Sequence, residues 1–229
     1  MNQIIRDAMA EDLPAITEIY TDAVLNTVAT LDTVPPTLES RAEWLHSHGG
    51  RCPVLVAVVD GEVAGWASLS VWNDRGAYTH TAESSVYVAR THRRRGIGAL
   101  LLAAIEARAR ELNYHVIIAR VVATNETSLK LVRGAGYEDV GIIREVGYKF
   151  NTWLDMCVLQ RILPCAPGES TLRHSQADGT LTASIVPHYN RAAQDDRPDD
   201  TGHTARRHTC YHVDLRARSR EHGGDARHG

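Results

Sequence analysis

The spacing of apolar residues changes several times along the chain, and each change indicates a new element. Residues 11–25 carry apolar side chains three or four positions apart, as in an amphipathic helix. Residues 54–59 form a continuous apolar run, which is typical of a buried strand. The pair Asp60–Gly61 follows directly and favours a tight hairpin turn into a second strand. The pattern therefore predicts helices and hairpin-connected strands in one chain.

The element order expected for residues 4–160 mixes the two types throughout. Strands are expected at residues 4–5, 54–59, 62–71, 83–88, 115–122, 137–146 and 153–160, the last two connected by residues 147–152. Helices are expected at residues 11–25, 37–47, 98–112 and 125–134, with Thr37 as the N-cap of the second. This order predicts an α/β (α+β) fold, a mixed central β-sheet with helices on both faces. The strand–helix–strand unit from Glu83 to Val122 is expected to be a right-handed parallel crossover.

Residues 81–102 join a strand to a helix through a basic, glycine-containing turn. Residues 86–88 favour the strand, and an apolar stripe with helical spacing begins at Ile97. The turn between them reads Arg93-Arg94-Arg95-Gly96-Ile97-Gly98. Free N–H groups at a helix start, glycine and arginine all suit a phosphate group. The stretch predicts an anion site, and a solvated basic loop is the alternative.

Comparison of the turn with known motifs reduces the number of possible phosphate-containing ligands. The turn is not GxxxxGK[ST], which excludes a P-loop, and it lacks one glycine of the dinucleotide fingerprint GxGxxG. It does contain Arg93-x-x-Gly96-x-Gly98, which matches the R/Q-x-x-G-x-G/A signature of the GNAT N-acetyltransferases. In that superfamily the corresponding loop holds the pyrophosphate of acetyl-CoA.

Composition excludes several other classes of protein. The chain has 229 residues, 43% of them apolar, and a net charge of −3, so neither nucleic acid nor an anionic membrane is an expected partner. The four cysteines have no C-x-x-C spacing, so no zinc site and no disulfide framework is expected. No charged-then-apolar leader and no long apolar run occurs, which excludes a signal peptide and a membrane span and makes the cytoplasm the expected location.

The composition changes at Pro164. Residues 165–229 hold seven of the twelve histidines and nine arginines, but no lysine or phenylalanine. Large aliphatic residues are few there, so the segment is expected to be a disordered extension of a domain formed by residues 1–164. Metal binding by the histidines is an alternative, which their irregular spacing disfavours.

From about Ile4 to Arg161, the chain resembles the phosphinothricin and methionine sulfoximine acetyltransferases, a branch of the GNAT superfamily. Three segments carry the resemblance: residues 77–88, the turn Arg93-x-x-Gly96-x-Gly98, and Gly141-x-x-Arg144-Glu145-x-Gly147-Tyr148-Lys149-Phe150-x-x-Trp153-x-Asp155. The resemblance implies transfer of an acetyl group from acetyl-CoA to the amino group of a small amino-acid-like molecule, without a metal. It also implies a homodimer.

The resemblance assigns site residues by position. The residues that it assigns to cofactor binding are Val86, Tyr87, Val88, Arg94, Arg95, Gly96, Ile97, Gly98, Ala99 and Asn125. Substrate binding falls to Arg75, Gly76, Ala77, Tyr78, Glu83, Ser84 and Ser85. Glu83 is the implied catalytic base, because an ammonium group must lose a proton before it can attack a thioester. Arg75 would pair with an acidic group of the substrate. Without the resemblance, a solvated strand end and a loop charge are the plainer readings of Glu83 and Arg75.

Two positions depart from the family pattern. Val132 stands where many relatives have a tyrosine or histidine that protonates the leaving thiolate, and valine cannot donate a proton. Leu31 stands where a phenylalanine commonly covers the substrate. Two other functions stay open: an acetyl-CoA-binding sensor without turnover, and a protein N-terminal or lysine acetyltransferase. The second would need an open peptide groove, whereas the hairpin at Trp153–Asp155 is expected to close the site around a small molecule.

Overall fold

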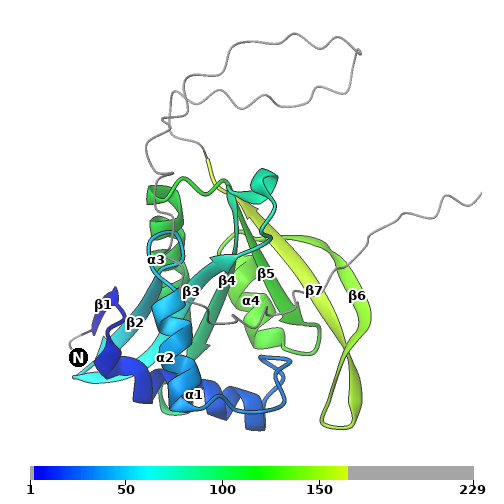
Figure 1. Ribbon diagram of the computed structural model, residues 1–229. Coiled ribbons are helices and arrows are strands. Elements are labelled where there is room, and N and C mark those ends of the chain that lie inside the picture. The colour runs from blue at the N-terminus through cyan, green and yellow to red at the C-terminus, as the bar shows by residue number, and fades with distance from the viewer. Residues whose placement is uncertain (1–2, 165–229) are drawn as a thin grey trace, which may run out of the picture. The chain divides into compact units, whose positions relative to one another are not determined.

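The computed structural model of the protein describes residues 3–164 (Figure 1). The strands are β1 (Gln3–Asp7), β2 (Val54–Val59), β3 (Glu62–Val71), β4 (Thr81–Val88), β5 (Val116–Val122), β6 (Glu138–Lys149) and β7 (Thr152–Ile162). The α-helices are α1 (Leu13–Asn26), α2 (Leu38–Ser47), α3 (Ile97–Glu111) and α4 (Glu126–Gly134), and short 3-10 turns lie at Ala10–Asp12, Gly76–Tyr78 and Arg90–His92. The expected disordered extension, residues 165–229, lies outside the described residues, as do its histidines.

The seven strands form one mixed sheet in the order β1-β2-β3-β4-β5-β7-β6. Every neighbouring pair is antiparallel except β4 and β5, which are parallel and are connected through α3. The predicted mixed sheet and the parallel pairing of its strand–helix–strand unit are confirmed.

Alternating side chains of the sheet enter two separate cores. On one face, Ile16 and Ile19 of α1 pack with Val56 and Trp66. The opposite face packs against α3 and α4 in a larger core, whose members include Leu55, Ala67, Leu69, Leu101, Ile105, Leu129 and Leu159. Because β3 sends Trp66 to one core and Ala67 to the other, it lies between the two helical layers. Helices therefore cover both faces of the sheet, as predicted.

Turns and helix starts follow local sequence signals at most positions. Asp60 and Gly61 both adopt positive φ, at 50° and 91°, as the predicted two-residue hairpin requires. Thr37 caps α2 by accepting a hydrogen bond from the Ser40 amide at 3.1 Å. In the described part of the chain, no helix has both the length and the apolar character needed to cross a membrane.

The connection between the last two strands differs from the expected one. Residues 147–152 were expected to form the whole turn, but β6 continues to Lys149 and β7 begins at Thr152. Only Phe150 and Asn151 remain in the turn, with φ of 51° and 58°. Pairing between Gly147–Lys149 and Thr152–Leu154 extends the hairpin at the expense of an unusual backbone conformation at Phe150. The hairpin tip is therefore longer than predicted.

Pairing between the two parallel strands is short. The register runs from Thr81↔Val116 to Glu83↔Ile118 and then ends, although β4 continues to Val88 and β5 to Val122. The two strands diverge beyond Glu83, so the edge of β4 from Ser84 to Val88 is not paired with β5. The candidate active site lies at this divergence.

Candidate active site

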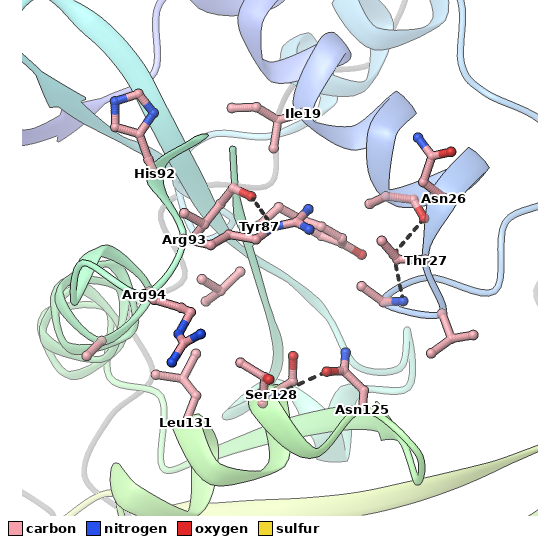
Figure 2. A pocket seen from close by; sticks show the side chains of 18 of the residues that line it. Ile19, Asn26, Thr27, Tyr87, His92, Arg93, Arg94, Asn125, Ser128 and Leu131 are labelled. Carbon is pink, nitrogen blue, oxygen red and sulfur yellow. Dashed lines mark hydrogen bonds between the residues drawn. The ribbon is translucent and has the colours of Figure 1, made fainter. Parts of the chain in front are cut away.

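A cavity of about 760 Å³ lies at the divergence of β4 and β5 (Figure 2). Its lining comes from the end of α1, from β4, from the turn before α3 and from the start of α4. The lining residues are Ile19, Ala23, Asn26, Thr27, Val28, Ala29, Val86, Tyr87, Val88, His92, Arg93, Arg94, Gly96, Gly98, Ala99, Thr124, Asn125, Thr127, Ser128, Leu131 and Phe150. Its size suits a substantial organic ligand.

The backbone of the turn before α3 allows a ligand to approach it closely. Arg94 and Gly96 both adopt left-handed φ, at 64° and 82°, and Gly96 is the N-cap of α3. The first amides of a helix have no partner within it, so the N–H groups at Ile97 and Gly98 are available to an acceptor. With the helix dipole and the Arg94 side chain, they make this wall of the cavity attractive to an anion.

Gly98, in the first turn of α3, faces α4 and β4. A Cβ at this position would lie 3.3 Å from Leu131 Cδ2 and 3.7 Å from Val88 Cγ2, and all three residues line the cavity. A larger side chain at position 98 would therefore fill space between α3, α4 and β4. The glycine keeps that part of the cavity open.

Arg93 connects the turn to two other elements. Its Nε donates to the Val88 carbonyl at 3.2 Å, and its Nη2 donates to Asp22 Oδ2 of α1 at 2.9 Å. Figure 2 shows Arg93 among the residues that line the cavity. The first residue of the R-x-x-G-x-G signature thus joins the turn to both α1 and β4.

Most of the residues predicted to bind the cofactor meet at this cavity. Val86, Tyr87, Val88, Arg94, Gly96, Gly98, Ala99 and Asn125 all line it. Arg95 and Ile97 do not line it: Arg95 is exposed elsewhere on the turn, and the Ile97 side chain is buried in the larger core. Asn125 is the N-cap of α4, where its Oδ1 accepts from the Ser128 amide at 3.2 Å and leaves its Nδ2 as a donor towards the cavity (Figure 2).

The residues predicted to bind the substrate lie apart from the cavity lining. Arg75 is the N-cap of the 3-10 turn Gly76–Tyr78, and all four are exposed. Glu83, Ser84 and Ser85 lie on β4 directly before the lining residues 86–88. The predicted substrate and cofactor residues therefore occupy consecutive stretches of β4.

Glu83 forms an ion pair that sequence analysis did not anticipate. Arg120 of β5 donates from Nε to Oε1 at 2.7 Å and from Nη2 to Oε2 at 2.8 Å. The Glu83 side chain is 18% exposed and that of Arg120 is 49% exposed. The pairing fixes the orientation of the carboxylate at the point where the strands diverge.

Val132 cannot act as an acid in this structure, as expected. Val132 belongs to α4, and its side chain is buried in the larger core. Five residues later, Tyr137 is also buried, and its hydroxyl lies 3.3 Å from Ser84 Oγ of β4. Burial raises the pKa of Tyr137, which keeps the hydroxyl protonated.

An aromatic cluster supports the cavity from the α1 and α2 side. Tyr87 stacks on Trp66, with ring centroids 4.7 Å apart. Arg41 is 6% exposed and lies over the rings of Tyr20, Trp44 and Trp66 at 4.2, 4.1 and 5.1 Å. Burial lowers the pKa of Arg41 and raises that of Tyr20 to about 12. The cation–π contacts and the stacked rings pack these side chains together beside Tyr87.

Several lining residues were missed by sequence analysis. They are Ile19, Ala23, Asn26, Thr27, Val28, Ala29, His92, Arg93, Thr124, Thr127, Ser128, Leu131 and Phe150. Arg93 belonged to a recognised signature, but nothing local marks the end of α1 or Phe150 as part of a site. Over residues 3–164, no group of three or more histidine, cysteine or acidic residues is arranged to hold a metal ion.

The chain is similar to several known acetyltransferases. Residues 5–158 match the family model described as an acetyltransferase (GNAT) domain. An L-methionine sulfoximine/L-methionine sulfone acetyltransferase from Pseudomonas aeruginosa is 40% identical over 162 residues, which cover 70% of this chain and 94% of the relative. A phosphinothricin acetyltransferase from Sinorhizobium meliloti, solved with acetyl-CoA, is 36% identical with a TM-score of 0.69, covering 71% of this chain and 89% of that one.

A third similar protein has a different name. The ribosomal-protein-alanine N-acetyltransferase from Brucella melitensis is 43% identical, with a TM-score of 0.67, covering 70% of this chain and 99% of that one. All three are named as acetyltransferases, and the family model runs from within β1 to within β7. The chain belongs to the GNAT acetyltransferase family.

Proposed function

We propose that the protein transfers an acetyl group from acetyl-CoA to the amino group of a small amino-acid-like acceptor. The observation that carries this proposal is the divergence of β4 from β5 beyond Glu83, which leaves the β4 edge facing a cavity beside a helix N-terminus. One end of the cavity suits phosphate groups, and a carboxylate stands beside the other end of the unpaired edge.

The residues around the cavity fit acetyl-CoA. The amides at the start of α3 and the side chain of Arg94 suit the pyrophosphate. The unpaired edge formed by Val86, Tyr87 and Val88 offers backbone donors and acceptors to amide groups of the pantetheine arm. When bound, acetyl-CoA supplies the acetyl group as an activated thioester. An N–H of this edge stabilises negative charge that develops on a carbonyl oxygen held against it.

Glu83 is the proposed base for the acceptor. An α-ammonium group must lose a proton before nitrogen can attack, and Glu83 takes that proton directly or through a water molecule. Arg120 holds the carboxylate in one orientation while leaving lone pairs on both oxygens. Arg75 and Tyr78, exposed before β4, are the proposed contacts for the acidic group of the acceptor.

The names of the relatives suggest the acceptor class. Methionine sulfoximine, methionine sulfone and phosphinothricin are amino acids with a polar sulfur or phosphorus group on the side chain. Two alternatives are distinct: a peptide with N-terminal alanine, suggested by the Brucella melitensis protein, and acetyl-CoA binding without turnover.

An acceptor screen tests these functions together. Purified protein is incubated with acetyl-CoA and each candidate, and release of the free thiol is followed with a disulfide reagent. The proposal predicts turnover with one or more of the three amino acids and little with a peptide beginning in alanine. Turnover with the peptide alone would support the second function, and binding without turnover on any acceptor would support a sensor.

The exposed side chains of β6 support a homodimer. β6 is an edge strand of the described sheet, yet its exposed residues include Val140, Ile142, Ile143, Val146 and Tyr148. Phe150 and Trp153 continue the apolar surface around the hairpin. An apolar edge strand of this length invites pairing with another chain. We propose that a second copy of the protein covers it.

A further inference from the structure

Lys149 is the last residue of β6 and one of two lysines in a chain with 25 lysines and arginines. Its side chain is only 4% exposed. Burial lowers the pKa of the Lys149 ammonium group from its ordinary value of 10.5. A buried ammonium group needs hydrogen-bond acceptors close by. The acceptors of the Lys149 ammonium group therefore show which parts of the chain this residue connects.

The acceptors come from a distant part of the chain. Lys149 Nζ donates to the Thr27 carbonyl at 2.9 Å and to the Thr30 carbonyl at 2.8 Å, across separations of 122 and 119 residues. Both carbonyls belong to the segment 27–32 that follows α1. Lys149 thus joins the tip of the β6–β7 hairpin to this segment.

A second contact joins the same two segments. A Cβ at Gly147 would lie 2.8 Å from Leu31 Cδ1 and 2.9 Å from Leu31 Cδ2. Only glycine at position 147 lets Leu31 pack this closely on β6. The adjacent motif residue Asp155 accepts a hydrogen bond from the Glu145 amide at 2.8 Å, which holds the irregular part of β6 just before this contact.

Both joined segments line the cavity. Thr27, Val28 and Ala29 supply one part of its wall, and Phe150, next to Lys149, supplies another. Figure 2 shows Asn26 and Thr27 on the side of the cavity opposite Arg93 and Arg94. The hairpin therefore contacts segment 27–32 directly beside the cavity, and Tyr20 of α1 contacts the same segment through Thr30 and Asp32.

We propose that Lys149 is a positioning residue that holds segment 27–32 against the hairpin and so sets the width of the acetyl-CoA cavity. The inference rests on the proposed function, because it takes acetyl-CoA as the occupant. It gives a role to residues Gly147–Phe150 of the family motif. The proposed roles of the turn before α3 and of Glu83 do not explain these residues.

The first test uses the full chain without any ligand. Hydrogen exchange of the segment 27–32 amides is compared in wild type, Lys149→Met and Lys130→Met. Lys130 is the matched control, since it is the other lysine and is 80% exposed beside Glu126. Lys149→Met should speed exchange in this segment about tenfold, whereas the control should leave it unchanged. Equal exchange in wild type and Lys149→Met would overturn the proposal, whatever the protein's activity.

The second test measures acetyl-CoA affinity by calorimetry. Loss of two charge-assisted hydrogen bonds should raise the Kd of Lys149→Met about tenfold or more, and Lys130→Met should bind as wild type does. Leu31→Ala keeps Lys149 and removes the second contact, so its Kd should rise in the same direction by about twofold to threefold. A purely structural lysine would lower the melting temperature without changing the Kd, and that result would overturn the proposal.

The two tests separate this inference from the proposed function. If wild type failed to bind acetyl-CoA, the proposed function would be wrong. The cavity beside segment 27–32 would then not be an acetyl-CoA site. If wild type bound acetyl-CoA and turned over an amino acid while Lys149→Met matched it in Kd, only the positioning role would be wrong.

Discussion

Arg120 of β5 binds Glu83 of the neighbouring parallel strand β4. Its guanidinium donates hydrogen bonds of 2.7 and 2.8 Å to the two carboxylate oxygens. Glu83 lies opposite Ile118 at the last register position before β4 and β5 diverge, and Arg120 lies two residues further along β5. A bidentate pair fixes the plane of a carboxylate as well as its position. The proposed base is therefore oriented by the same strand whose departure opens the cavity.

Removal of the Arg120–Glu83 ion pair should lower kcat more than it weakens acetyl-CoA binding. In Arg120→Met, Glu83 loses its orientation, so kcat should fall by about fivefold to tenfold while the acetyl-CoA Kd stays within twofold of wild type. Steady-state kinetics and calorimetry check this split. An unchanged kcat would show that the ion pair only joins the strands.

Substitution of the base itself should have a larger effect. Glu83→Gln keeps the shape of the side chain but cannot accept a proton, so kcat should fall by roughly 10²–10⁴ near neutral pH. Part of the rate should return towards pH 9–10, because the free amine fraction grows about tenfold per pH unit below its pKa. A rate equal to that of wild type would remove Glu83 from the chemistry.

Asp12 should make the fold sensitive to acid. It is 4% exposed and accepts from Arg6 at 2.6 and 2.9 Å and from the Met9 amide at 2.8 Å. Burial alone would raise the pKa of Asp12, but these hydrogen bonds outweigh it and lower the pKa below its ordinary 3.8. The stabilisation is therefore fully present above the unfolded value and is lost as pH falls through the lower folded value.

Urea unfolding can measure this dependence. Asp12→Asn should lower the free energy of unfolding by about 2 kcal/mol at pH 7, and its difference from wild type should shrink below about pH 4. Asp7→Asn, at a largely exposed carboxylate, is the control and should change stability little. A difference that stayed constant down to pH 2 would contradict the assignment.

The exposed edge of β6 should respond to a charge. Ile142 is 56% exposed, so Ile142→Lys should leave the fold intact while opposing a second copy. Sedimentation equilibrium should show a dimer for wild type and a weaker dimer or a monomer for the variant. Ile4→Lys, at a similarly exposed residue of β1, should remain dimeric. A monomeric wild type would refute the dimer.

The C-terminal segment should be dispensable for stability. Its composition offers few large aliphatic residues for a core, so a chain ending at Pro164 should keep its melting temperature within about two degrees and its acetyl-CoA affinity. Thermal unfolding of the shortened chain checks this. A large drop would move the domain boundary beyond Pro164.

Features encoded over short distances could be predicted from the sequence. The Asp60–Gly61 hairpin, the Thr37 cap and the glycine turn that leads into α3 each depend on a few neighbouring residues, and each adopts the predicted backbone structure. The order of the strands and helices follows from the same local patterns. Val86, Tyr87 and Val88 of β4, which line the cavity, could be proposed as cofactor contacts because a recognisable motif lies close to them in the sequence.

Features that join distant segments could not be predicted in this way. Arg120 lies 37 residues from Glu83, and Lys149 lies more than 100 residues from Thr27, with no local pattern that couples them. Arg41 lies on a polar helix, yet tertiary packing buries it among three aromatic rings. Phe150 adopts a positive φ that a bulky residue normally avoids, because the paired strands on either side close the turn.

The most direct test of the account is acetyl-CoA titration of wild type and Gly98→Val by calorimetry. Valine at position 98 would fill the space between Leu131 and Val88 beside the start of α3, where the phosphate groups are proposed to bind. The account predicts one site per chain in wild type and at least about tenfold weaker binding in the variant, with a similar melting temperature. Equal affinity in a folded Gly98→Val protein would contradict it, because the cavity at the divergence of β4 and β5 would then not hold acetyl-CoA.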